Sequence, residues 1–408
     1  MAWLRQWAAR IPPGFFRPPN LAQKAKAVNR PILDQKLRRT LALDLRDFSL
    51  PQGVDGRAGE AQVFNVEREA LPVPSLGAIL LEEIIGATVD RQPEEKVHWR
   101  VMFAFRGKLC SLELRKFGCR LLVCDDHAVR TADELISKLQ SVIKKSEKFA
   151  FNEFASAQMS AGNVTVENRA ASFRDMYTFF REKAEGALLA PSPERPGEDG
   201  FGLAGLLNDH FGRHREALYF GLGMLDSYFS WFEHAMVLLL PFAGYDPATD
   251  DLVAFIGDNW ADKYDRILGF QDATSKRHYE ELNEIKERLR NTYAHGGFEK
   301  RGGSLGIHLD GFSPVPATMT RVVHSASFRL FPIDGAKLAE VKATLDAFDG
   351  YLAQRYPAGM AFVDSGIPLV FSSKDVQDIV RRASDLDEFR AWLEGFGQYL
   401  DAQANGDF

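Results

Sequence analysis

Apolar residues along the chain recur with two periods, and these periods separate two kinds of structure. Val97, Trp99, Val101 and Phe103 alternate with polar or small residues, which is the period of a half-buried strand. From residue 210 onward, apolar and aromatic residues instead recur over long stretches with helical spacing. The pattern therefore predicts an α+β N-terminal domain followed by a mostly α-helical bundle.

The α+β domain is expected to have the element order α-β-β-β-α. Thr131 opens its second helix and Glu134 follows three residues later, which is a capping-box pattern. Tight turns are expected at 106–108 and 116–118, where glycine separates alternating segments. The expected elements are a helix at 76–85, strands at 97–103, 109–115 and 119–124, and a helix at 131–149.

The bundle is expected to begin with a long helix, 214–240, that ends at Pro241. At 1.5 Å per residue this helix would be about 40 Å long, and its many apolar side chains require burial on most sides. A small β-like insertion is expected at 304–329. The other helices are expected at 252–268, 275–294, 335–356, 373–383 and 385–402.

Changes in composition indicate where the domains begin and end. The N-terminal arm is irregular in pattern and rich in Pro, Arg and Lys, and a Pro-rich linker at 191–197 indicates a boundary near residue 200. The expected organisation is an arm at 1–74, the α+β domain at 75–150, a helical connector with linker at 151–210, and the helical bundle with its C-terminal helices at 211–408.

Charge and cysteine content restrict the classes of function. The 408-residue chain has a net charge of −6, so it does not bind nucleic acid through bulk positive charge, and any polyanion site would be local. Cys110, Cys119 and Cys124 have gaps that match no common zinc pattern. The most apolar run, 236–242, is too short to span a bilayer. We therefore expect a cytoplasmic protein with reduced cysteines, no membrane segment, no metal and no cofactor.

One short stretch combines charged residues, a helix end and a glycine pair. Residues 284–297 read EIKERLRNTYAHGG, in which Arg290 is followed by Asn291 and then, four positions on, by His295. This resembles the HEPN superfamily, whose members carry an Arg, a polar residue and a His at the C-terminal end of a late bundle helix. The resemblance covers the bundle and none of residues 1–200. It implies that Arg290, Asn291 and His295 are catalytic.

The resemblance implies an endoribonuclease of the kind found in bacterial toxin and anti-phage defence systems. Attack by the RNA's own 2′-OH needs a proton shuttle and a cation beside the phosphorane oxygens, and needs no metal. A histidine ordinarily has a pKa near 6.5, which suits His295 to the proton shuttle. Arg290 offers a planar, charged guanidinium as the cation beside the phosphorane oxygens. Asn291 would hold the ribose, the phosphate or the His tautomer. The expected products are a 2′,3′-cyclic phosphate and a 5′-OH.

Helix geometry makes a second copy of the chain part of this expectation. Five residues of α-helix turn by about 500°, so Arg290 and His295 would point roughly 140° apart. HEPN proteins typically pair their helix ends across a two-fold axis, which implies a homodimer through the bundle. Tyr293, which could stack on a base, and a set of four basic residues are expected to bind substrate. Glu233 is expected in a second polar shell behind them. The basic set is Lys286, Arg288, Lys300 and Arg301.

Two alternatives stay open from the sequence. An Arg and a His at a helix C-terminus also simply complement the helix dipole, so the chain could instead be a non-catalytic dimeric scaffold that binds RNA or a protein partner. The order α-β-β-β-α is also that of double-stranded-RNA-binding domains, although the glycine-rich lead and tight lysine cluster of that family are missing. The resemblance to toxin and defence proteins further implies a regulatory protein partner, or an N-terminal part that senses a trigger.

Overall fold

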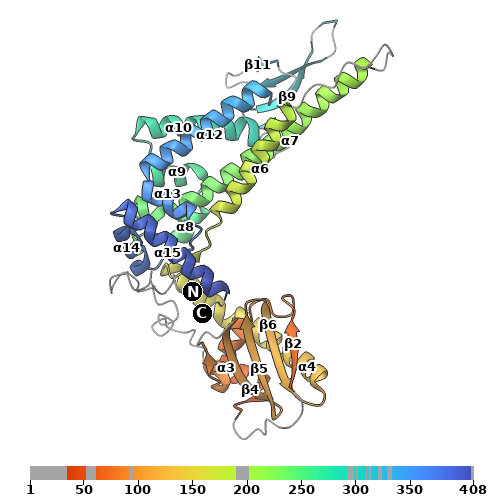
Figure 1. Ribbon diagram of the computed structural model, residues 1–408, viewed down its shortest axis with the longest axis vertical. Coiled ribbons are helices and arrows are strands. Elements are labelled where there is room, and N and C mark those ends of the chain that lie inside the picture. The colour runs from red at the N-terminus through yellow and green to blue at the C-terminus, as the bar shows by residue number, and fades with distance from the viewer. Residues whose placement is uncertain are drawn as a thin grey trace, which may run out of the picture. The chain divides into compact units, whose positions relative to one another are not determined.

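The structure is a computed structural model that describes residues 35–51, 61–91, 96–189, 202–291, 298–299, 302–308, 310–311, 314–319, 324–328 and 333–405. The chain divides into two compact units, Met1–Ala161 with Glu394–Phe408, and Gly162–Leu393. The first contains a small antiparallel sheet with helices, and the second is mostly helical (Figure 1). The expected sequence of an α+β part followed by a helical part is therefore confirmed.

The first unit is organised around a six-stranded antiparallel sheet of order β1-β4-β5-β6-β2, with β3 paired to β4 beside β1. The three expected strands are its centre, and the structure adds three strands that the alternation did not reveal. The strands are β1 (Phe48–Ser49), β2 (Ala61–Val66), β3 (Val89–Asp90), β4 (Val97–Phe105), β5 (Lys108–Arg115) and β6 (Gly118–Cys124).

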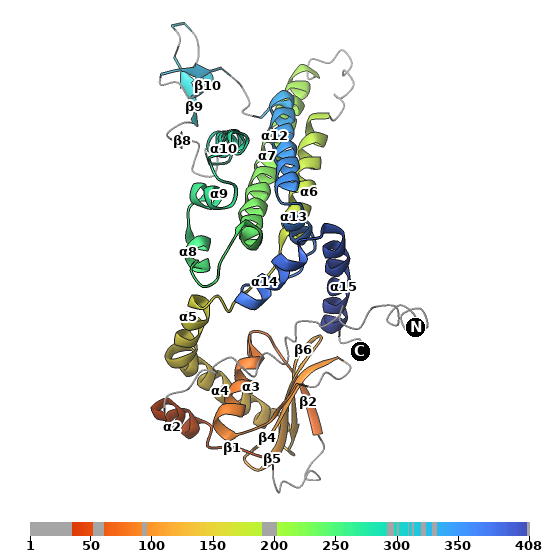
Figure 2. The same ribbon diagram turned by 90° about the vertical axis from the view of Figure 1, so that its left-hand side faces the viewer.

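Helices cover one face of this sheet, as Figure 2 shows for α3 and α4. The alternate residues Val101, Phe103 and Phe105 of β4 and Leu112 of β5 join α4's Leu139 in a fully buried core. Period-two alternation thus sends one set of side chains to the helices and the other set to the opposite face. The helices are α2 (Gln35–Asp44), α3 (Pro74–Ile85), α4 (Ala128–Ser146), the π-helical η2 (Glu147–Phe151) and α5 (Asn152–Ser160).

Both expected hairpin turns are present. Phe105 pairs with Lys108, so the first turn has two central residues, Arg106 and Gly107, at φ of 48° and 75°. Positive φ at both positions is the type I′ geometry that matches strand twist, and glycine adopts it without strain. Arg115 pairs with Gly118 across the second turn.

The three cysteines are free and buried, as small core residues of the sheet. Burial raises the pKa of the Cys110 thiol and of the Cys119 thiol to about 12. Thiols with so high a pKa hold almost no thiolate at neutral pH and are poor nucleophiles. They act as packing groups and not as reactive ones.

The basic side of the helix expected at 131–149 is largely engaged in ion pairs. Lys138 Nζ lies 2.5 Å from Asp47 Oδ2, and Lys145 Nζ lies 2.6 Å from Asp44 Oδ2. These contacts hold the end of α2 against α4. Lys138 and Lys145 are therefore paired with carboxylates, which leaves less free positive charge on this helix for an RNA.

The second unit contains a pair of long helices, α6 (Ala170–Leu189) and α7 (Gly202–Leu239), that lie side by side (Figures 1 and 2). Arg181 forms a two-pronged ion pair with Asp346 of α12 (Gly335–Arg355), which ties α6 to a third helix. α6 lies within residues 151–210, which the sequence assigned to a connector, yet it packs along α7 and belongs to the same compact unit. The Pro-rich linker at 191–197 thus separates two helices of one unit in the sequence.

The single helix expected at 252–268 is two helices, α8 (Leu252–Gly257) and α9 (Trp260–Leu268). The break has a local cause. Asp258 is extended, with ψ of 156°, and the Asn259 side chain accepts hydrogen bonds from the Ala261 and Asp262 backbone N–H groups. An N-cap of this kind starts a new helix.

The rest of the second unit follows the expected pattern closely. The β-like insertion is the four-stranded sheet β11-β10-β9-β8, and β7 pairs with β12. The helix α13 and the strands β7 and β12 were not anticipated. These elements are β7 (Thr165–Val166), η3 (Leu240–Ala243), α10 (Ala273–Ile285), η4 (Lys286–Asn291), β8 (Phe298–Glu299), β9 (Gly302–Ile307), β10 (Val315–Met319), β11 (Ala326–Ser327), α13 (Pro357–Asp364), β12 (Leu369–Val370) and α14 (Ser373–Arg382). The helix α15 (Leu386–Asn405) begins in the second unit, and its residues from Glu394 onward belong to the first.

Among the helices that the structure describes, none is both long enough and apolar enough to cross a membrane. In the long helix α7, Asp226 and Glu233 lie within the stretch that is richest in aromatic residues.

Two glycines of the bundle allow a matched test of its packing. A Cβ at Gly359 of α13 would lie 2.6 Å from Leu239 Cδ2 and 3.2 Å from Phe242 Cγ, whereas a Cβ at Gly350 of α12 would meet open space. We expect Gly359→Ala to lower the free energy of unfolding by about 1–3 kcal/mol through overpacking. Gly350→Ala is expected to raise it by about 0.5–1 kcal/mol. Urea denaturation measures both, and equal effects of the two changes would contradict this packing.

Candidate functional site

The segment that carries the motif is the end of α10 and its continuation, η4. Asp272 caps α10 by accepting hydrogen bonds from the Thr274 and Ser275 backbone N–H groups. His278, Leu282 and Ile285 are buried, and their spacing of four and three residues gives α10 a single inward face. Leu289 continues this face into η4. Burial of one stripe therefore leaves the charged residues of the motif on the remaining faces.

From Lys286 to Asn291 the helix is π-helical. In this form the hydrogen bonds join residues five apart, and short π segments often occur at functional sites. Each residue turns less about the axis than the 100° of an α-helix, so residues five apart lie closer in angle. The winding thus changes in the direction that would bring two such residues together.

Arg290 is held by an ion pair with α7. Its Nε and Nη2 donate to Asp226 Oδ1 at 3.1 and 3.0 Å, and its Nη1 donates to Asn291 Oδ1 at 3.4 Å. The Arg290 side chain is 34% exposed and that of Asp226 is 64% exposed. Exposed pairs of this kind contribute about 0–1 kcal/mol, so a phosphate can compete with Asp226 for the guanidinium.

Lys286 lies on an aromatic surface beside the same helix. Its Nζ is 4.7 Å from the centroid of the Trp260 ring, which is stacked on Tyr279. Burial lowers the pKa of Lys286, the Glu233 carboxylate opposes that effect, and the Arg290 charge adds to it. Glu233, expected in a second polar shell, is therefore an electrostatic neighbour of Lys286.

Two carboxylates of α7, Asp226 and Glu233, are the electrostatic partners of two cations of η4, Arg290 and Lys286. Asp226 and Glu233 are seven residues apart, and so share one face of α7. Asp226 contacts Arg290, and the charge of Glu233 acts on Lys286. The site expected from the sequence does not include Asp226; its i, i+7 relation to Glu233 could have pointed to it, but the motif does not reveal its partner.

Arg288 does not join this set. Its Nη1 lies 3.0 Å from Glu284 Oε1, one turn earlier on the same helix, and its Nε is buried without a hydrogen bond in the described part of the chain. Two residues along a helix point to opposite sides, which separates Arg288 from Arg290. The structure therefore pairs Arg288 with Glu284 and not with the acids of α7, and its expected role in binding substrate stays a prediction.

The other expected site residues lie outside the part of the chain that the structure describes. These are Tyr293, His295, Lys300 and Arg301, together with the glycines Gly296 and Gly297. The structure brings Arg290 and Asn291 together with Asp226. The roles of the remaining residues stay predictions.

His234, the neighbour of Glu233, has a structural role on another side of α7. Its Nε2 accepts a hydrogen bond from the Arg169 backbone N–H at 2.9 Å, and its ring packs against Phe173. Burial lowers the pKa of His234. Glu233 and His234 therefore do not act together as one polar pair.

Comparisons of the chain with protein-family models, with curated proteins and with solved structures gave no match.

The pKa of His234 predicts how stability depends on pH. A folded-state pKa below the ordinary value of about 6.5 means that the unfolded chain binds the proton first. The contribution of His234 to the free energy of unfolding is therefore fully present above pH 6.5 and is lost as the pH decreases below that value. We expect the loss of unfolding free energy between pH 7.5 and 5.5 to be smaller in His234→Gln, whose amide oxygen can still accept from Arg169. Urea denaturation measures this loss. The exposed His127→Gln is the control, and an unchanged loss in the His234 variant would contradict the argument.

Proposed function

We propose that the protein is a metal-independent endoribonuclease of the HEPN type, belonging to a toxin or defence system. The observation that carries the proposal is the half-exposed Arg290 guanidinium, held by Asp226 next to Asn291 on a π-helical segment. An arginine fixed in this way needs little reorganisation to meet the charge that develops on a phosphorane. Its Asp226 ion pair is exposed enough for RNA phosphate to replace it.

In the proposed reaction, Arg290 binds the non-bridging oxygens of the scissile phosphate. His295 removes the proton of the 2′-OH and a second proton transfer reaches the leaving 5′-oxygen, so that the products are a 2′,3′-cyclic phosphate and a 5′-OH. Asn291 holds the sugar or the phosphate through its amide. Two helix ends from two copies would place Arg290 of one copy beside His295 of the other, so that each site draws its cation and its proton-transfer group from different chains. The homodimer is therefore part of the mechanism proposed here.

Lys286 would assist in a second way. Its ammonium is partly desolvated on Trp260, and an anion nearby recovers electrostatic energy that water does not supply there. Lys300, Arg301 and Tyr293 would extend the contact with RNA. In this proposal the first unit restrains the nuclease or senses its trigger, and a regulatory protein partner is expected.

A non-catalytic scaffold is the alternative, and the ion pairs of Arg290 and Arg288 favour it. Both guanidinium groups already have carboxylate partners, as structural arginines commonly do. In this case the bundle binds RNA or a protein partner without cleaving RNA. The same assay separates the two functions.

We expect the purified protein to cleave single-stranded RNA in the presence of EDTA. Arg290→Ala and His295→Ala should each lower the rate by about a hundredfold or more, because each removes a group that acts in the transition state. Arg277→Ala, an exposed arginine on α10, is the matched control and should have no effect. Cleavage is followed by gel electrophoresis of end-labelled RNA.

Two outcomes would contradict the proposal that the protein is a ribonuclease. If folded wild-type protein binds RNA without cleaving it, the scaffold is the better description. If cleavage persists in His295→Ala, the activity belongs to another site or to a contaminant.

Asp226→Asn tests whether Asp226 positions Arg290. We expect kcat to fall by roughly tenfold, since the guanidinium loses its orientation, while KM does not rise, because one negative charge leaves the phosphate site. The melting temperature should change little, as an exposed ion pair contributes at most about 1 kcal/mol. Glu280→Gln on α10 is the control. A large fall in melting temperature with unchanged kcat would mean that Asp226 is only structural.

A further inference from the structure

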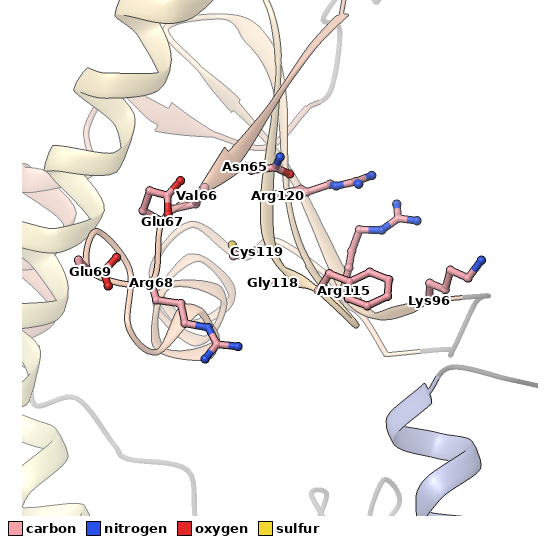
Figure 3. Close-up of a pocket in the computed structure, with 11 residues that line it drawn as sticks. Asn65, Val66, Glu67, Arg68, Glu69, Lys96, Arg115, Gly118, Cys119 and Arg120 are labelled. Atoms are coloured by element: carbon pink, nitrogen blue, oxygen red, sulfur yellow. The ribbon is translucent and has the colours of Figure 1, made fainter.

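The first unit has a pocket that the proposed nuclease does not use. It lies where β2 ends and where the turn between β5 and β6 begins, and it has a volume of about 590 Å³. Pockets of roughly 300–1,000 Å³ are typical of sites for small ligands. Its walls include Arg68, Lys96, Arg115, Phe117 and Arg120 (Figure 3).

The pocket is positively charged although the chain as a whole is acidic. Four cationic side chains line it, against two carboxylates, Glu67 and Glu69. Figure 3 shows Arg115, Arg120 and Lys96 on one side of the pocket, and Glu67, Glu69 and Arg68 on the other, just past the end of β2. Three of the four cationic groups are thus collected on one side, which favours recognition of an anion there.

Strand register explains how these arginines are presented. Glu113 lies opposite Arg100 on β4 and opposite Arg120 on β6, and all three belong to the sheet face that the helices leave open. Glu113 accepts from Arg100 at 2.6 Å and from Arg115 at 3.3 Å. The one carboxylate is therefore shared between two arginines, which leaves Arg120, an exposed residue, as an excess positive charge beside them.

An aromatic ring lies on the rim of this basic pocket. Phe117 is 83% exposed, at the two-residue turn between β5 and β6, and Lys116 Nζ lies 5.4 Å from its ring centroid. So large an exposed ring contributes nothing to the core. Exposed aromatic rings among cationic side chains are the common platform for a nucleobase, because every base has a face on which to stack.

We propose that this pocket binds a free nucleotide. The phosphate groups lie against Arg115 and Arg120, with Arg68 and Lys96 at the sides, and the base stacks on Phe117. The volume of the pocket favours a single nucleotide over a long strand. The pocket is in a different unit from Arg290, so the proposal does not depend on the proposed nuclease. A free nucleotide is also a suitable chemical class of signal for the control of a nuclease.

Isothermal titration calorimetry of the full-length protein with ADP, GDP, CDP and UDP tests the proposal, with inorganic phosphate and adenosine as partial ligands. We expect at least one nucleotide to bind more tightly than either partial ligand. Arg120→Ala should weaken it by about tenfold, because a charge-assisted hydrogen bond is lost. Phe117→Ala should weaken it by a similar factor through the loss of stacking. Arg39→Ala, an exposed arginine of α2, should leave the affinity unchanged.

Both substituted residues are exposed, so the variants are expected to fold, and their melting temperatures verify this. Absence of binding by all four nucleotides would overturn the proposal, as would equal binding by the wild type and both variants. Binding of a single-stranded oligonucleotide without binding of any free nucleotide would also overturn it, and would assign the pocket to nucleic acid.

Discussion

The Arg174 guanidinium lies 3.5 Å from the centroid of the Trp231 ring and forms an ion pair with Asp349 at 2.8 Å. These contacts join α6, α7 and α12 at one point. Tyr228 of α7 donates to the same Asp349 at 2.8 Å, and both Tyr228 and Trp231 are fully buried. The Arg174 and Asp349 side chains are each 27% exposed, and their pairing and hydrogen bonds offset the loss of water around the rest of each group. This network therefore fixes the rotation of α7 about its own axis.

The rotation of α7 determines which side chains it offers to η4. With Tyr228 and Trp231 turned toward α6 and α12, Asp226 and Glu233 are left for Arg290 and Lys286. The candidate site is thus a consequence of packing in the bundle. It follows that Arg290 has an orientation that helix η4 alone would not give it, since a solvated arginine samples many rotamers.

The sequence predicts the elements whose pattern is local. The strands β4 to β6 and the helices α7 and α12 follow from alternation and from helical spacing, because each buries one face. The break at Asp258 and Asn259 was missed, since apolar spacing continues through it and only the capping geometry shows the interruption. The strands β1 and β3 have two residues each, too few for a period, and the six residues of β2 do not alternate cleanly between buried and exposed. All three are stabilised by pairing with distant strands.

The candidate site shows the same division between local and distant information. The motif gives Arg290 and Asn291 at a helix end, and both lie there. It does not give Asp226, because the partner is 64 positions away and the pairing depends on the rotation of α7. Nor does it give the π-helical turn, which arises where the buried stripe of α10 continues to Leu289. Contacts between distant helices thus decide how a local motif is presented.

The central claim is that two copies of the chain complete one nuclease site. Mixing Arg290→Ala protein with His295→Ala protein tests it directly, because a mixed dimer has one intact Arg290 and one intact His295 on different chains. The account predicts that the mixture cleaves RNA well above the level of either variant alone. If mixed dimers form, as affinity tags on each variant can show, and the mixture is as inactive as its parents, the composite site is contradicted.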